Sequence, residues 1–207
     1  MKTILYIHGM GGGKDSRIPN YLMTVLDPKE FRVIIRTYDF DPPVGRAQIE
    51  GWVTEEKPDL IIGESLGSIQ ALRIQGIPHI FVSPSLGAPR KLVQVAPLAL
   101  FALGRWYLHH IYPVKEGERQ PLKFTYPVLR RYKEHWEAAL SAIGPKESYY
   151  AFFGEHDHFM RSGIVRVELW RQLFGDDTYT MYPGTHFMEE EFVDALLVPK
   201  IRETLQK

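Results

Sequence analysis

Six short apolar runs recur along the chain, and each is rich in β-branched or aromatic residues. Most of them show little alternation between apolar and polar positions. That pattern is typical of strands buried on both faces of a parallel sheet. We therefore predict strands over residues 3–7, 31–36, 60–62, 80–83, 149–153 and 179–182.

The stretches between these runs show helical spacing of apolar residues. Stripes of residues three and four apart occur within 18–26, 49–53, 66–72 and 165–173. Gly175 follows the last stripe and is predicted to end that helix. A final helix is predicted from about Glu189, with a kink at Pro199. Strands that alternate with helices predict an α/β fold with right-handed crossovers.

A long section between the runs at 80–83 and 149–153 breaks this rhythm. It contains several prolines and a dense set of aliphatic and aromatic side chains. We predict a mostly helical insertion over residues 85–147 that lies over one end of the sheet as a lid or cap. An ordinary extra pair of helices with its own core is the alternative.

Composition and charge narrow the classes of function. The chain has 207 residues, which suits one domain over 1–207 that includes the insertion. Lys+Arg and Asp+Glu both number 25, so no net field attracts nucleic acid or an anionic membrane. There is no cysteine, hence no disulfide framework and no thiol chemistry. No apolar window is long enough for a membrane span, and the first apolar run is too short for a signal peptide. We expect a cytoplasmic protein, as a monomer or homodimer.

The glycine-rich stretch YIHGMGGGKDS, at residues 6–16, resembles a phosphate-binding loop only superficially. A P-loop would need glycine where His8 stands and a hydroxyl where Asp15 stands. A dinucleotide fingerprint would need its third glycine where Lys14 stands. Both phosphate-binding interpretations fail at positions that the chemistry requires.

The segment PDLIIGESLGSIQALRIQ, at residues 58–75, offers a nucleophile. A short apolar strand ends in Gly63-Glu64-Ser65-Leu66-Gly67, and an amphipathic helix is predicted to follow at once. G-x-S-x-G between a strand and a helix places its serine on a sharp, strained turn, so that the hydroxyl projects from the sheet edge. We predict that Ser65 is a nucleophile.

A serine hydroxyl needs a base to remove its proton, and two later strand ends supply the partners. Asp157 follows the run at 149–153, and His186 follows the run at 179–182. In a parallel sheet both loops emerge at the carboxyl edge that carries Ser65. His186 is predicted as general base and then general acid, and Asp157 as the group that orients it.

Other residues could compete for these roles. Glu155 lies on the same loop as Asp157 and is an alternative acid. Asp176 and Asp177 lead into a strand, which places them at the opposite edge. His156 and His158 could join His186 as metal ligands, but no carboxylate–histidine spacing of a zinc motif accompanies them, so we predict no metal.

The predicted nucleophile suggests another role for the glycine-rich stretch at residues 6–16. A tetrahedral intermediate carries an oxyanion that two backbone N–H groups can stabilise. One would come from Leu66, after the nucleophile, and the other from the loop that follows the first strand. Met10 is the predicted donor there, with Gly11 as the second choice. Glycines let this backbone approach closely.

Together these motifs carry a family likeness. HGMGG, GESLG, GEHD and PGTHF, each after a predicted strand, resemble the α/β-hydrolase superfamily and its compact bacterial serine esterases. The resemblance implies a three-layer α/β sandwich, with a mostly parallel sheet of about six strands in the order 2-1-3-4-5-6. It also implies a triad of Ser65, Asp157 and His186, and a lid inserted after the fourth strand.

We expect hydrolysis of carboxylic esters through an acyl-enzyme, with small to medium apolar acyl groups and no cofactor. Gly9, Glu64, Trp106 and Tyr107 are predicted to contact the small-molecule ester. A thioesterase, amidase or acyltransferase with the same triad is an alternative. A binding module with little turnover, or a scaffold whose segment 93–108 contacts a partner, is an alternative of another class.

Overall fold

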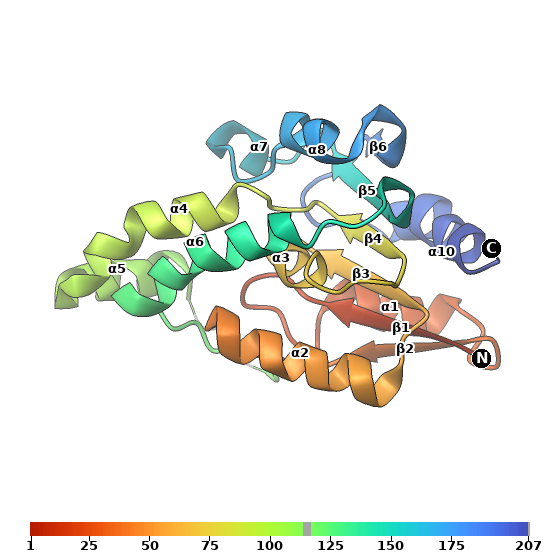
Figure 1. The fold of residues 1–207 in the computed structure, drawn as a ribbon, viewed down its shortest axis with the longest axis horizontal. Coiled ribbons are helices and arrows are strands. Elements are labelled where there is room, and N and C mark those ends of the chain that lie inside the picture. The colour runs from red at the N-terminus through yellow and green to blue at the C-terminus, as the bar shows by residue number, and fades with distance from the viewer. Residues whose placement is uncertain (114–116, 207) are drawn as a thin grey trace.

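The computed structural model describes residues 1–113 and 117–206, and its centre is a six-stranded sheet (Figure 1). All five strand pairs are parallel, and the order is β2-β1-β3-β4-β5-β6. All six predicted strands are confirmed, as is their order. Their bounds are β1 Lys2–Ile7, β2 Phe31–Ile35, β3 Leu60–Glu64, β4 His79–Val82, β5 Tyr149–Gly154 and β6 Tyr179–Tyr182.

Helices cover both faces of the sheet and explain why the strands are apolar throughout. Leu5 and Ile7 of β1 pack toward the face covered by α2 (Pro42–Glu56), α3 (Gly67–Ala71), α6 (Tyr126–Ser141) and α8 (Val167–Phe174). Ile4 and Tyr6 pack toward the opposite face. That face is covered by α1 (Arg17–Val25), α9 (Glu190–Phe192), the π-helical turn η4 (Val193–Leu197) and α10 (Val198–Leu205). Because successive side chains alternate in direction, the central strands have apolar residues at most positions.

Two helices differ from the sequence-based expectation. The helix after Ser65 has only five residues, Gly67–Ala71, because the chain must turn back within a few residues to enter β4. The last helix is irregular one turn before Pro199, in η4. A proline ring collides with the carbonyl four residues earlier, which here belongs to Ala195 within that turn. Gly175 ends α8 as predicted, with a φ of 101°.

The section predicted as an insertion, 85–147, divides into two parts, and its residues 114–116 lie outside the described part of the chain. α6 packs against α2 and α3 in the helical layer on the sheet, and it also packs against α4 and η1. α4 (Ala88–Val95), the 3₁₀ turn η1 (Ala96–Leu100) and α5 (Ala102–Ile111) extend away from the N-terminal end of the molecule (Figure 1). Short helical turns complete the fold: α7 (Phe159–Ser162), η2 (Lys146–Ser148) and η3 (Asp176–Thr178). None of the described helices is long and apolar enough to cross a membrane.

His135 on α6 is buried beside two arginines and makes folding sensitive to pH. Arg73 donates a hydrogen bond of 3.1 Å to its Nδ1 atom, and its Nε2 atom has no partner in the described part of the chain. Burial, together with the positive charges of Arg73 and Arg46, lowers the pKa of His135 to about 3. The unfolded chain therefore takes up a proton below about pH 6.5, whereas the folded chain does not.

We expect this histidine to reduce stability as the pH falls from about 6.5 toward 3, by up to ~1.4 kcal/mol per pH unit. His135→Gln keeps an acceptor for Arg73 and cannot be protonated. Urea denaturation between pH 7 and 5 gives the slope of the unfolding free energy against pH. In His135→Gln this slope should decrease by the amount that corresponds to the uptake of about one proton on unfolding. His110→Gln, at an exposed position of α5, is the matched control. An unchanged slope in His135→Gln would contradict the assignment.

Candidate active site

Ser65 sits where β3 ends and α3 begins, in a backbone conformation that few residues other than glycine adopt. Its φ is 49°, and its N–H donates to the carbonyl of Val82 on the neighbouring strand. Such a turn costs energy and persists because the surrounding sheet and helix hold it. The predicted sharp turn is therefore present, and it places the serine hydroxyl at the carboxyl edge of the sheet.

Gly67 lets α3 approach the end of β1. A Cβ atom at this position would lie 2.3 Å from the carbonyl oxygen of His8 and 2.5 Å from that of Ile7. Both are backbone atoms of the strand end, so they cannot move aside as a flexible side chain would. The close approach of β1, and with it the loop that follows, depends on this glycine.

We expect Gly67→Ala to lower the unfolding free energy by about 2–3 kcal/mol, as overpacking does in a rigid core. Urea denaturation measures it. Gly51→Ala in α2 is the matched control, because a Cβ there meets no atom within 4 Å. That variant should gain about 0.5–1 kcal/mol, since alanine favours the helix. Equal stability of the two variants would argue against a steric role for Gly67.

The structure brings Ser65, His186 and Asp157 into one hydrogen-bonded row. The hydroxyl of Ser65 lies 2.9 Å from Nε2 of His186, and Nδ1 of His186 lies 2.7 Å from Oδ2 of Asp157. The side chains of His186 and Asp157 are 3% and 0% exposed. Oδ1 of Asp157 accepts a hydrogen bond of 2.8 Å from the N–H of Phe159. Both oxygens of the Asp157 carboxylate thus accept hydrogen bonds. This arrangement keeps the proton of the imidazole on Nδ1, so that Nε2 can accept the hydrogen bond of the Ser65 hydroxyl.

The competing residues are not part of this hydrogen-bonded row. Glu155 is exposed, and Asp157 is the acid that contacts His186. Asp176, in η3 just before β6, lies at the opposite edge of the sheet and pairs with Arg171. His156 and His158 are exposed. Within residues 1–113 and 117–206, no three histidine and carboxylate side chains are grouped as a metal site.

Two site residues escaped prediction from the sequence. The hydroxyl of Ser85 lies 3.1 Å from that of Ser65. The ring of Phe159 packs edge-on against His186, with centroids 4.6 Å apart. Ser85 follows β4, the strand next to β3, so its position at a strand end was the available signal. Phe159 lies two residues after Asp157, but only the folded loop shows that its ring covers the imidazole.

The glycine loop after β1 folds back on itself and onto the segment that precedes α6. The N–H of Gly11 donates to the side chain of Gln120, and that of Gly12 donates to the carbonyl of Gly9. No acceptor faces the N–H groups of Met10 or Leu66 in the described part of the chain. A Cβ at Gly9 would lie 2.9 Å from the Cβ of Ser65, which shows how closely this loop passes the serine. The two predicted oxyanion donors are thus unpaired beside Ser65.

Glu64 is a second carboxyl group beside the serine, and it is outside the hydrogen-bonded row. It accepts a hydrogen bond of 3.0 Å from the hydroxyl of Tyr6, and the backbone of Gly9 also contacts it. Burial raises the pKa of Glu64, although the Tyr6 hydroxyl and the charge of His186 oppose the shift.

Two cavities meet at Ser65. One has a volume of about 130 Å³ and a mostly aliphatic and aromatic lining from α4, α5 and the loop after β5. The other has a volume of about 430 Å³ and includes charged side chains, among them Asp15, Arg17 and Arg119. Gly9 and Glu64 line the larger cavity, where they were predicted to contact substrate. Met10 and Ser65 line both cavities.

Trp106 and Tyr107 depart from the prediction, because neither lines either cavity. Their side chains are half or more exposed on α5. Leu108 and Ile111 of the same helix line the smaller cavity instead. The helical repeat explains the difference, since only one face of α5 turns toward the sheet. Sequence alone located the helix without identifying that face.

Comparison with known proteins rests on the fold. No family model and no curated protein matches the chain. Among solved structures, the chain is similar to Est1E from Butyrivibrio proteoclasticus, solved with ferulic acid bound. The TM-score is 0.63 and the identity 14%, over 100% of this chain and 90% of the other.

The chain has the α/β-hydrolase fold. A serine hydrolase from Cycloclasticus zankles (10% identity, 99% and 89% of the two chains, TM-score 0.49) is also similar. So is the Staphylococcus aureus fluorophosphonate-binding serine hydrolase F (13% identity, 99% and 84%, TM-score 0.48). At TM-scores below 0.5, these two add nothing to the fold assignment. In this α/β-hydrolase fold, β3 to β6 run parallel, so the loops that follow β3, β5 and β6 emerge at one edge of the sheet.

Proposed function

We propose that the protein is a serine hydrolase that cleaves carboxylic esters through an acyl-enzyme, with Ser65, His186 and Asp157 as its triad. One observation carries the proposal: the hydrogen-bonded row of 2.9 Å and 2.7 Å that opens onto two cavities. A strained serine, a buried base and a buried carboxylate in this order are the groups that acyl transfer requires.

The chemistry follows from the positions of these groups. As the Ser65 hydroxyl attacks the ester carbonyl carbon, Nε2 of His186 takes its proton. The resulting oxyanion accepts hydrogen bonds from the N–H groups of Met10 and Leu66. The tetrahedral intermediate collapses, the bond to the alcohol oxygen breaks, and His186 returns the proton to that oxygen. Water then attacks the acyl-enzyme with the same base, releasing the acid and regenerating Ser65.

The two cavities suggest where the acyl and alcohol parts of an ester would bind. The smaller, apolar cavity of about 130 Å³ would take the acyl group. That volume is close to the ~150 Å³ apolar cavity that accommodates benzene, so acyl chains of about four to six carbons fit best. The larger cavity, with Glu64, Arg17 and Arg119 in its lining, would take a polar alcohol part. The helices α4 and α5 would act as the lid of the smaller cavity, within the insertion over residues 85–147.

Hydrolysis of p-nitrophenyl esters from acetate to palmitate, together with labelling by a fluorophosphonate, tests the proposal. We expect labelling at Ser65 and an optimum at butyrate or hexanoate. Labelling without ester turnover would favour a thioester or amide substrate. Absence of both labelling and turnover would leave the fold as a binding module and overturn the proposal.

A further inference from the structure

The far end of the molecule exposes a cluster of large apolar side chains. They come from η1, from α5 and from Phe101 between these two elements, and they are between 44% and 74% exposed. We call this cluster the apolar tip; its residues are Leu98, Leu100, Phe101, Leu103, Trp106, Tyr107 and Ile111. Single exposed apolar residues are ordinary, but a contiguous group of this kind marks a contact surface.

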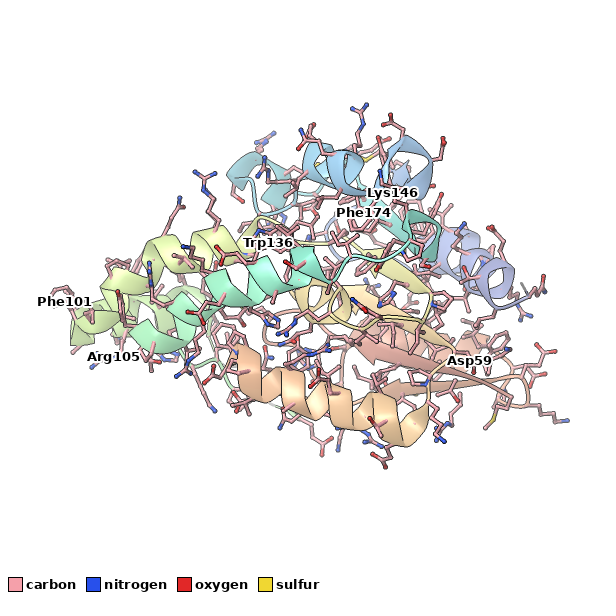
Figure 2. The ribbon with its side chains drawn as sticks, viewed as in Figure 1. Asp59, Phe101, Arg105, Trp136, Lys146 and Phe174 are labelled. Carbon is pink, nitrogen blue, oxygen red and sulfur yellow. The ribbon has the colours of Figure 1, made fainter. Side chains whose placement is uncertain are left out.

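The tip projects beyond the rest of the fold. Figure 2 shows Phe101 and Arg105 at one end of the molecule, far from Asp59 near the opposite end. α5 already buries Leu108 on its inner face, and Ile111 lines the smaller cavity, so the other exposed side chains lie on its remaining surface. The helix therefore already has a contact with the core. Its exposed apolar side chains form a second surface, separate from that contact.

Charge distinguishes the possible partners. The chain as a whole carries equal numbers of acidic and basic residues, but residues 65–113 contain no aspartate or glutamate at all. Arg90 and Lys91 are exposed on α4, which leads into the tip, and Arg105 lies within it. The neighbouring α6 carries three basic side chains and two acidic ones, with Lys133 paired to Glu137. The even total charge thus conceals a cationic segment, residues 65–113, that has no acidic residue.

We propose that the apolar tip docks the protein on an anionic lipid surface, with Phe101, Leu103 and Trp106 entering the interface and Arg90 and Lys91 facing lipid phosphates. Aromatic and leucine side chains beside lysine and arginine are the combination that binds such interfaces. A second copy of the chain is disfavoured as the occupant, because two cationic tips would repel each other. Exposure of this apolar area to water is unfavourable, so its burial in a lipid interface would lower the free energy.

Vesicle co-sedimentation tests the proposal directly. We expect the protein to bind vesicles of equal parts phosphatidylcholine and phosphatidylglycerol, to bind pure phosphatidylcholine less, and to dissociate as salt is raised. Phe101→Ser/Leu103→Ser should reduce partitioning roughly tenfold or more, since both side chains leave water on binding. Arg90→Glu should reduce it roughly fivefold on anionic vesicles only.

The controls separate docking from folding and from self-association. Val44→Ser removes an exposed apolar side chain from α2, away from the tip, and should bind vesicles as the parent does. Thermal unfolding by circular dichroism checks that the tip variants fold, as expected for exposed positions. The emission of Trp106 should shift to the blue on anionic vesicles, and Trp106→Phe should abolish that shift.

Three results would overturn the proposal. The first is the absence of binding to anionic vesicles at low salt, and the second is equal binding by Phe101→Ser/Leu103→Ser. The third is a dimer in light scattering that this double variant dissociates, because the tip would then be covered by a second copy. Neither readout depends on hydrolysis, so these experiments test the docking proposal independently of the proposed activity.

Discussion

Ser65→Ala is expected to lower kcat for p-nitrophenyl butyrate by roughly 10⁴–10⁶-fold. The substitution removes the hydroxyl oxygen that lies 2.9 Å from Nε2 of His186, and no acyl-enzyme can then form. Ser85 lies 3.1 Å from that oxygen but makes no hydrogen bond to His186 within the described part of the chain, so it does not replace the nucleophile. The residual rate would come from the oxyanion donors and substrate binding alone.

The fold should survive this change. Alanine tolerates the φ of 49° no worse than serine does, and the lost hydrogen bonds face a cavity that water can enter. Ser68→Ala is the matched control, because Ser68 lies three residues further on and its buried hydroxyl donates only to the carbonyl of Gly63. That variant should keep its activity. A Ser65→Ala protein with more than a tenth of the parent activity would exclude Ser65 as the nucleophile.

Asp157→Asn is expected to lower kcat by roughly 10³–10⁴-fold at neutral pH. The N–H of Phe159 already donates to one carboxylate oxygen at 2.8 Å, so the asparagine must keep its carbonyl there. Its NH₂ group would then face Nδ1 of His186, which must become an acceptor. The proton moves to Nε2, and the imidazole can no longer take the proton of Ser65.

This result also decides between the two acids of the loop after β5. Glu155→Gln is the matched control, because it removes one negative charge from the same loop at an exposed position. It should leave kcat within about twofold of the parent. If Glu155→Gln were inactive while Asp157→Asn retained activity, the acid would have to be reassigned to Glu155.

Much of the site follows from local sequence signals. G-x-S-x-G between a buried strand and a turn required Ser65 to adopt a strained conformation, and the structure shows a φ of 49°. Asp157 and His186 each follow a strand, and parallel strands end at one edge, so their convergence could be foreseen. Such features can be predicted from the sequence because buried strands and tight turns each require particular residue types within a few consecutive positions.

The tertiary structure decided what depends on the direction of side chains and on distant segments. Ser85 and Phe159 reach the site only because β4 lies next to β3 and the loop after β5 folds over His186. Trp106 and Tyr107 turned outward because one face of α5 was already taken by its core contact through Leu108.

By itself, then, the sequence determined the six strands, their order through the family likeness, and the order of serine, acid and histidine. Only packing decided that α6 joins the helical layer on the sheet while α4 and α5 reach beyond it. The physical reason is the range of the interactions. Strand, turn and nucleophile are specified by neighbours in the chain, whereas cavity walls and the exposed tip arise where segments far apart in sequence compete for the same core surface.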